Sequence, residues 1–322
     1  MKVLEFSRYA LSSCIVAALL AGCGGSQPPI TAPGAMPQAR AMVAHTDRAL
    51  PTTLNIGKLK ADLFVDDSSH DAVEILKNGT WHNLGSITQG IAYPNGNWVD
   101  SRRNLYVTNA FDSSAYISEY GRSGKLKFTY SSGMKFPAAV ATDSEGNVYE
   151  ADSFTGVNEY RQGSNVVVAS CPQLGGGQRG IAVDSHRNVF VTYGNGSDAG
   201  AIEEYSGGLA GCPAKTLGVA LGLPGGIALD KNANLLVCDE TNRSVDVIAS
   251  PYSQISGYLG SDYLYPLDVS INQDNSQAYV TDWGDIEVDV LSYPSGSKIA
   301  TLNSNNGIRQ PTGAVDGSNF VP

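Results

Sequence analysis

The sequence predicts an all-β fold, a six-bladed β-propeller, from three observations. From about residue 59 onward, short runs of alternating apolar and polar residues are bounded by Gly, Asn and Asp, which is typical of strands. These runs recur in six sets. The first and last copies of the innermost strand, around Ile91 and Ala314, lie 223 residues and five steps apart, about 45 residues per step. This period suits a four-stranded propeller blade.

The innermost strand of each blade is predicted where small residues flank an apolar one. The six copies are Gly90–Ile91–Ala92, Ala139–Val140–Ala141, Gly180–Ile181–Ala182, Gly226–Ile227–Ala228, Asp268–Val269–Ser270 and Gly313–Ala314–Val315. A second and a third strand follow each copy. The outer strands are predicted at Leu84–Ile87, Leu126–Tyr130, Val166–Ala169, Thr216–Leu221, Ile255–Leu259 and Lys298–Leu302.

The two ends of the chain are predicted to share one blade. The N-terminal set lacks an innermost strand, and the C-terminus offers a spare one at Pro311–Val315. Pairing them closes the ring and leaves only short, protected strand edges. Within a blade, the turn after the innermost strand carries Asp and Asn, as in Asp184–Asn188, whose side chains can bond nearby backbone amides.

The N-terminus is predicted to be a targeting segment. Lys2 and Arg8 precede an apolar run that ends in Leu20-Ala21-Gly22-Cys23, and a basic start, an apolar run and small residues are typical of a secretory signal peptide. The run is short for a spanning helix. These residues resemble the lipobox of bacterial lipoproteins, which implies cleavage after residue 22 and lipid attachment to Cys23.

Export of this kind implies a protein anchored to the bacterial membrane by acyl chains. Gly24 stands where an aspartate marks retention in the inner membrane, so the outer membrane is favoured if the cell has two. Removing residues 1–22 removes Lys2, Glu5 and Arg8, so the formal charge changes from −10 to −10 − 1 = −11. This acidic balance argues against nucleic acid as a partner.

Three domains follow: a signal peptide over 1–22, a tether over 23–58 and a propeller over 59–322. The tether is rich in Pro, Ala, Gly and Gln and has too few apolar residues to order itself. The propeller repeats resemble NHL repeats, and more loosely the senescence-marker and gluconolactonase propellers, as in PGGIALDKNANLLVCDETNRSVDVI, Pro224–Ile248. The resemblance covers about residues 60–320 and implies a fold without a specific function.

One position follows the second strand in every blade. Its residues are Asp67, Asn109, Asp152, Tyr193, Asp239 and Asp282. A ring of carboxylates could hold metal, but a residue repeated in nearly every blade is better explained as part of how a blade is built. We therefore predict that each of these side chains caps the turn that follows it, with Tyr193 as the exception.

The position before the inner-strand glycine supplies Asn and Asp metal ligands in lactonase-type relatives. Its six copies in this chain are predicted to be Gln89, Ala138, Arg179, Gly225, Leu267 and Thr312, without Asn or Asp. None of the four histidines, His45, His70, His82 and His186, falls at the mouth position that streptogramin-lyase propellers use. No metal, cofactor or catalytic residue is therefore predicted.

The remaining departures from the repeat suggest a binding mouth. It would comprise Gln89, Glu150, Arg179, Tyr193 and Trp283. Cys171 and Cys212 lie in similar places in neighbouring blades, which allows a disulfide in an oxidising compartment, and Cys238 is predicted to be a buried thiol.

The leading hypothesis is a monomeric, membrane-anchored lipoprotein whose propeller binds a protein or glycan without catalysis. The alternatives are a lactonase-like or streptogramin-lyase-like enzyme with atypical ligands, and an envelope assembly scaffold.

Overall fold

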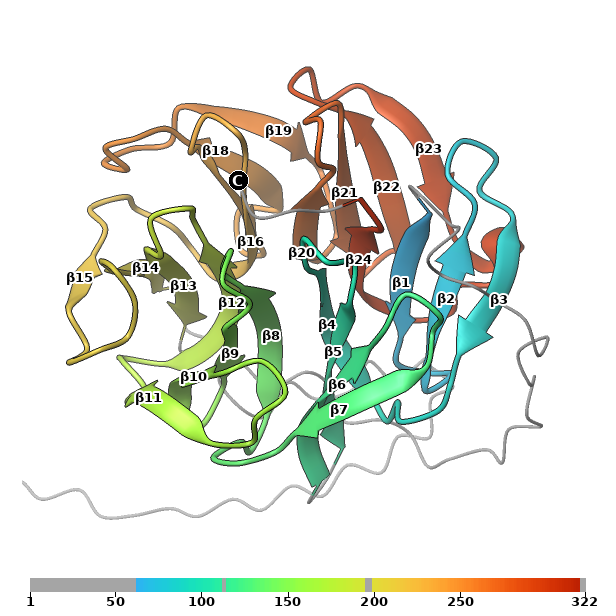
Figure 1. The fold of residues 1–322 in the computed structure, drawn as a ribbon. Helices are drawn as coiled ribbons and strands as arrows, with labels where there is room; N and C mark the ends of the chain where they lie inside the picture. The colour runs from blue at the N-terminus through green and yellow to red at the C-terminus, as the bar shows by residue number, and fades with distance from the viewer. Residues whose placement is uncertain (1–61, 112–113, 195–198, 319–322) are drawn as a thin grey trace, which may run out of the picture.

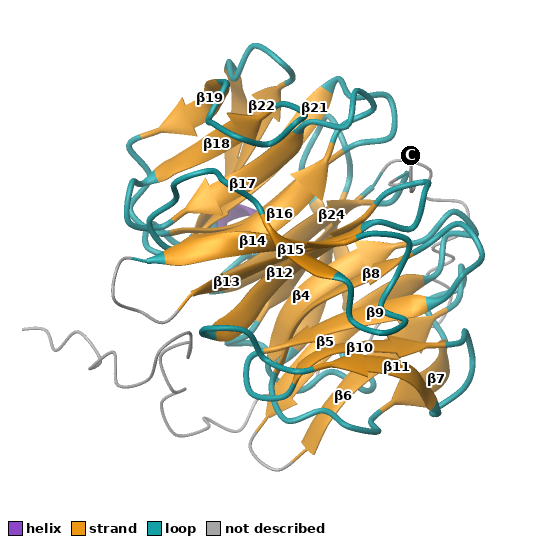
Figure 2. Cartoon of the chain, turned by 90° about the vertical axis from the view of Figure 1, so that its left-hand side faces the viewer, coloured by secondary structure: helices purple, strands orange, loops and turns teal. Residues whose placement is uncertain are grey.

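The computed structural model describes residues 62–111, 114–194 and 199–318. These form six four-stranded antiparallel sheets arranged in a ring, as Figure 1 shows. The predicted six-bladed β-propeller is confirmed. Figure 2 shows that strands and loops make up nearly all of this part of the chain, apart from a short 3₁₀ helix at Ser304–Asn306. Within the described residues, no helix has the length and apolarity needed to cross a bilayer.

Each blade has four strands, which follow one another from the central channel to the periphery. Blade 1 contains β24 (Pro311–Asp316), β1 (Leu63–Asp67), β2 (Ala72–Leu76) and β3 (Asn83–Ile87); blade 2 contains β4 (Pro94–Val99), β5 (Leu105–Phe111), β6 (Ser114–Tyr120) and β7 (Leu126–Tyr130); blade 3 contains β8 (Pro137–Thr142), β9 (Val148–Asp152), β10 (Gly156–Tyr160) and β11 (Val167–Cys171). Blade 4 contains β12 (Gly177–Val183), β13 (Val189–Gly194), β14 (Gly200–Tyr205) and β15 (Ala214–Thr216); blade 5 contains β16 (Pro224–Leu229), β17 (Leu235–Asp239), β18 (Ser244–Ile248) and β19 (Gly257–Ser261); blade 6 contains β20 (Pro266–Ile271), β21 (Gln277–Asp282), β22 (Glu287–Ser292) and β23 (Lys298–Leu302).

The ring closes in blade 1, as the sequence predicts. Strand β24 pairs with β1 in antiparallel register from Leu63–Asp316 to Asp67–Pro311. The ends of the described chain therefore lie side by side, and the amide of Gly317 donates to the carbonyl of Asp62. We call the side on which the inner strands begin the mouth face, and the side on which they end the turn face.

Two strand predictions are wrong. The inner strand of blade 2 is Pro94–Val99, not the stretch at Gly90–Ile91–Ala92. That triplet lies in the preceding loop, where Ile91 is buried and the amide of Ala92 donates to the Asn109 side chain. The outer strand of blade 4 is Ala214–Thr216, before the predicted Thr216–Leu221, because Leu217 and Val219 pack inward against blade 5 instead of extending the edge.

Packing between neighbouring blades forms the core. Six clusters of buried apolar side chains lie mainly between neighbouring blades, so each blade buries its faces against the blades on either side. Buried tyrosines on three second strands also satisfy the turns, because Tyr106, Tyr149 and Tyr279 donate to Asp100, Asp143 and Asp316. Burial of an aromatic ring with a bonded hydroxyl combines apolar contact with a satisfied polar group.

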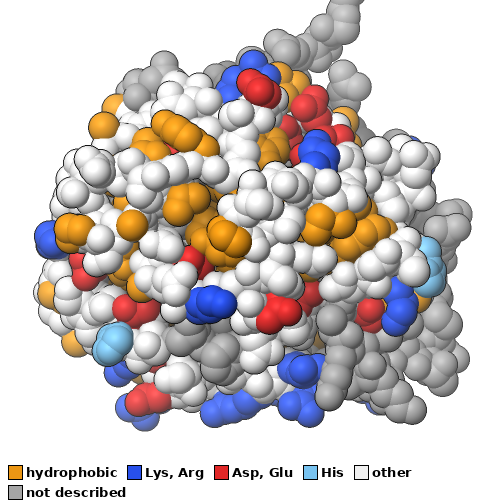
Figure 3. All heavy atoms as spheres, turned by 90° about the horizontal axis from the view of Figure 1, so that it is seen from above, with side chains coloured by type: hydrophobic (Ala, Val, Ile, Leu, Met, Phe, Trp, Pro, Cys, Tyr) orange, Lys and Arg blue, Asp and Glu red, His pale blue; other side chains and the backbone are white. Residues whose placement is uncertain are grey.

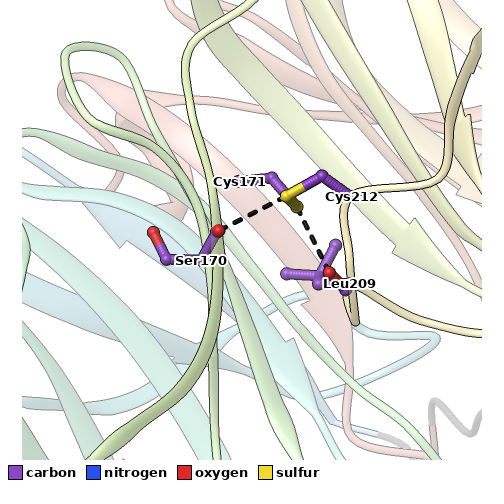
Figure 4. The surroundings of a disulfide bond; sticks show 4 residues. All are labelled: Ser170, Cys171, Leu209 and Cys212. Atoms are coloured by element: carbon purple, nitrogen blue, oxygen red, sulfur yellow. Dashed lines mark hydrogen bonds between the residues drawn. A yellow bond between two sulfur atoms is a disulfide. The ribbon is translucent and has the colours of Figure 1, made fainter.

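A disulfide joins blades 3 and 4 at their periphery. Cys171 ends β11, Cys212 lies in the loop before β15, and their Cα atoms are 5.5 Å apart. Figure 4 shows the bond beside the carbonyl oxygens of Ser170 and Leu209, each 3.4 Å from a sulfur atom. Cys238 is a buried free thiol in β17.

Candidate functional site

The acidic side chains that follow the second strands cap loops on the mouth face. The Asp67 carboxylate accepts hydrogen bonds from the amides of Arg309 and Gln310, at the entrance to the inner strand of the same blade. The carboxylates of Asp152, Asp239 and Asp282 do the same in blades 3, 5 and 6, and the Asn109 side chain does so in blade 2. The predicted capping of the next turn is confirmed for the four aspartates, since their carboxylates also accept from the amides of Ser69, Phe154, Asn242 and Gly284.

Tyr193 breaks this series for a reason of packing. Its ring lies against Gly175, where an added Cβ would be 3.0 Å from the ring. Burial, together with the Glu203 carboxylate, raises the pKa of its hydroxyl. Tyr193 therefore faces the outer part of blade 4 and does not line the channel.

Gln89 does not occupy the mouth position predicted for it. It is an exposed loop residue whose carbonyl accepts a hydrogen bond from Tyr120. Because the inner strand of blade 2 begins at Pro94, the residue before its glycine is Asn95. The mouth position therefore does contain one Asn, and the Asn95 amide donates to the carbonyl of Pro137 in blade 3.

Arg179 forms a buried ion pair at the mouth of the channel. Its guanidinium meets the carboxylate of Glu240, from the loop after β17, and the two side chains are 9% and 1% exposed. Burial opposes charge on Arg179, but Glu240 and Tyr265 outweigh it and raise the pKa of the guanidinium. Burial raises the pKa of Glu240 against the effect of Arg179. The pair thus holds its charge by mutual contact away from bulk water.

Trp283 packs against Tyr265, which in turn contacts this pair. Its ring packs edge-on against Tyr265 at 5.8 Å between centroids, and Tyr265 contacts both Arg179 and Glu240. Of the five predicted mouth residues, the structure brings only Arg179 and Trp283 together in this way. Glu240 and Tyr265 were not predicted from the sequence, although Glu240 directly follows the capping residue Asp239.

Exposed apolar side chains lie on the mouth-face loops of two blades. In blade 6, Leu264 and Ile286 are 50% and 47% exposed beside Trp283. In blade 3, Phe154 is 52% exposed and packs edge-on against Phe136 at 5.9 Å. These three exposed side chains and the half-buried Trp283 and Phe136 together form the apolar rim, whose loops are held in place by the capping carboxylates of Asp152 and Asp282.

The turn face differs in character. Figure 3 views the molecule from above in Figure 1, from the side on which β24 ends. Hydrophobic, acidic and basic side chains are interspersed over this face, without a large patch of one charge.

Glu150 is neither exposed nor paired with Arg179. It is fully buried in β9, and its carboxylate accepts from the Asn158 amide at 2.9 Å. Burial, reinforced by Asp152, raises the pKa of Glu150 well above its ordinary value. It therefore belongs to the interior of blade 3 and not to a binding mouth.

Within the described part of the chain, one group of three histidine or acidic side chains lies close enough together to hold a metal ion, namely Asp67, His70 and Glu74. Existing contacts explain it. Asp67 is the loop cap described above, its carboxylate lies 3.0 Å from His70 Nδ1, and Asn83 donates to Glu74 at 2.6 Å. The hydrogen bond to Asp67 is the main cause that raises the pKa of His70. This group therefore stabilises the β1–β2 loop.

The central channel runs between the inner strands and has a volume of about 80 Å³. Asn97, Arg179, Tyr265 and Asp268 are among its lining residues. Asp268 is half-buried in the wall of the channel, and the loss of water around its carboxylate raises its pKa to about 7. Cys23, the predicted lipidation site, lies outside the described residues.

Comparison with known proteins identifies the fold only. No family model and no curated protein matches the chain. A chain of the nidogen/laminin complex is similar at a TM-score of 0.62 and 17% identity, covering 80% of this chain and 98% of that one. A protein of unknown function from Bacteroides caccae is similar at a TM-score of 0.59 and 13% identity, with the same coverage. Both likenesses agree with a six-bladed β-propeller, and the resemblance to NHL repeats stays an interpretation.

Because the Arg179–Glu240 pair is buried, mutation can test whether it stabilises the fold or is available to a ligand. We expect Arg179→Met to lower the free energy of unfolding by about 3 kcal/mol, because it leaves the Glu240 carboxylate buried without its cation. The double variant Arg179→Met, Glu240→Leu should recover most of that loss. Urea unfolding of Arg179→Met, of Glu240→Leu and of the double variant measures the coupling free energy between the two side chains.

The control is Lys298, which is 54% exposed and pairs at 2.6 Å with the buried Asp289, a carboxylate that also accepts a hydrogen bond from Thr301. Lys298→Met should lower the free energy of unfolding clearly less than Arg179→Met, because Lys298 is half exposed and Thr301 still donates to Asp289. If Arg179→Met proved as mild as this control, Arg179 would not be a structural ion and would be available to a ligand.

Proposed function

We propose that this protein is a lipid-anchored binding module whose propeller contacts a protein partner through the mouth face. The single observation that carries the binding half of this proposal is the apolar rim: Leu264, Trp283 and Ile286 in blade 6, with Phe136 and Phe154 in blade 3. Phe154 projects into solvent, Trp283 and Phe136 are half-buried, and aromatic side chains on rigid loops are the anchors on which protein–protein contacts most depend.

The rim suits binding because its loops are already ordered by the fold. The amides of Leu264 and Tyr265 donate to Asp282, and those of Lys135 and Phe136 donate to Asp152. A partner would therefore contact side chains whose backbone needs no further ordering, which lowers the entropic cost of association.

The chemistry of the mouth supports binding over acid–base catalysis. Arg179 and Glu240 neutralise each other and are held by Tyr265, while the carboxylates of Asp152 and Asp282 are occupied by backbone amides. A general base needs a lone pair free to accept a substrate proton. One structural neighbour comes from a complex of nidogen with laminin, and this protein–protein complex adds support from the same fold.

The anchoring half of the proposal rests on Leu20-Ala21-Gly22-Cys23 and on the polar stretch that follows it. A lipid on Cys23 together with a tether over 23–58 would hold the propeller away from the membrane, at the outer membrane in a cell that has two. The apolar rim would then be reachable by an envelope protein.

Anchoring predicts that the protein incorporates a labelled fatty acid in cells and fractionates with membranes. Cys23→Ser should abolish the label, because the thiol that carries the lipid is gone. Cys14→Ser, in the apolar run of the signal, is the matched control and should leave the label unchanged. Label that persists in Cys23→Ser would contradict lipidation at this residue.

Partner binding predicts a site-dependent crosslink. A photo-reactive phenylalanine analogue at position 154 or 286 should give an adduct with the same protein in cells, because both positions lie on the mouth face. The control position is Tyr258, which is 65% exposed on β19 at the edge of blade 5. Trp283→Ala should weaken the adducts several-fold.

Equal adducts at position 258 would refute a mouth-specific interface. Absence of any protein adduct at 154 and 286, together with retention of the propeller by a glycan array, would assign the mouth to a glycan instead.

A further inference from the structure

Asp268 stands in the channel at a position that every other blade keeps small. The equivalent residues in the inner strands are Gly96, Ala139, Gly180, Gly226 and Gly313. Asp268 therefore places a carboxylate where no other inner strand has a side chain larger than methyl. A carboxylate in a narrow channel away from bulk water is costly unless something compensates its charge.

The neighbouring glycines leave space for this carboxylate. A Cβ on Gly226 would lie 2.2 Å from Asp268 Oδ1, so only glycine fits there. A Cβ on Gly313 would lie 3.4 Å from Asp268 Oδ2 and also 3.4 Å from the backbone nitrogen of Asn97. The space above Gly313 thus separates Asp268, in blade 6, from the inner strand of blade 2.

A second carboxylate lies beside Gly313. Asp66 in β1 is the register partner of Gly313, and its side chain is fully buried. The side-chain nitrogen of Asn97, Nδ2, donates to Asp66 Oδ1 at 2.9 Å, while Asp66 Oδ2 and Asn97 Oδ1 have no hydrogen-bond partner. Asp66 and Asp268 repel each other electrostatically, which adds to the effect of burial on the pKa of Asp66.

Among the described residues, no cationic side chain compensates these two carboxylates. None of the ion pairs in this part of the chain includes Asp66 or Asp268. Backbone amides of Val269 and Ala314 assist Asp268, but they bring no net charge. Two carboxylates and one amide oxygen without a cationic partner among the described residues are therefore gathered about Gly313, where blades 1, 2 and 6 meet.

We propose that Asp66, Asp268 and Asn97 bind a divalent cation of the Ca²⁺ or Mg²⁺ class at the wall of the central channel, between blades 1, 2 and 6. Such hard cations take carboxylate and amide oxygens as ligands, and two carboxylates match a charge of +2. Asn97 and Asp268 line the channel, whose volume of about 80 Å³ admits several waters that would complete the coordination, while Asp66 would bind the ion from the buried side. Thiol and imidazole ligands, which softer metals prefer, do not occur among these three residues.

This site would act on ring closure. Asp66 belongs to blade 1, Asn97 to blade 2 and Asp268 to blade 6, so one ion would connect the closing blade to both of its neighbours. An ion bound only by the closed ring stabilises that ring by mass action. This role is independent of what the apolar rim binds.

The test uses the full mature chain purified in detergent, freed of metal with EDTA and titrated calorimetrically with CaCl₂ and, separately, MgCl₂ at pH 8. We expect one ion per chain for at least one of the two, and a thermal midpoint that rises with that ion. Asp66→Asn should weaken the affinity at least tenfold. Asp268→Gly should do the same, and it introduces the residue that four other inner strands already carry.

The matched control is Asp246→Asn. Asp246 in β18 is as buried as Asp66 and has one oxygen without a hydrogen-bond partner, but it lies in blade 5 away from this group. Its substitution should leave ion binding unchanged. The proposal is overturned if the unaltered chain shows neither heat of binding nor a shift of the midpoint with either ion. It is equally overturned if Asp268→Gly binds as tightly as the unaltered chain.

Discussion

Ring closure is the constraint on which the rest of this structure depends. The C-terminal strand β24 completes the blade that begins at Leu63, and the Asp67 side chain accepts from backbone amides 242 and 243 residues away. Without β24, the inner edge of β1 would be unpaired and the clusters on both sides of blade 1 would lose Ala314 and Val315. An open edge of this kind exposes backbone groups and apolar surface together.

Once the ring is closed, the repeated and the exceptional residues serve different purposes. The repeated Asp and Asn side chains are consumed in holding turns and loop entrances, as Asp184 and Asp282 illustrate. Chemistry that is not needed by every blade appears only where one blade departs from the pattern. Arg179 with Glu240, Asp268 among glycines, and the aromatic pair of Tyr265 and Trp283 are such departures. They occur at the mouth or in the channel, where neighbouring blades meet.

Period and polarity predicted the blades because each blade must repeat the same burial pattern. They failed at Gly90–Ile91–Ala92, where a loop imitates an inner strand, while the true strand carries polar Asn95 and Asn97. That error displaced the mouth position from Asn95 to Gln89. Pairings between side chains of different blades could not be predicted from the sequence, because Glu240 and Arg179 are 61 residues apart and no local pattern marks them as partners. The same holds for Asp66 and Asp268, whose proximity depends on closure.

The most direct measurement compares hydrogen exchange in a chain that ends at Gln310 with a control chain that ends at Ser318. We expect the removal of β24 to abolish amide protection in all six blades together, since closure supports every interface of the ring. The control should keep the protection of the complete chain. Persistent protection of blades 3, 4 and 5 in the shorter chain would contradict this role of closure and show that the blades are stable without it.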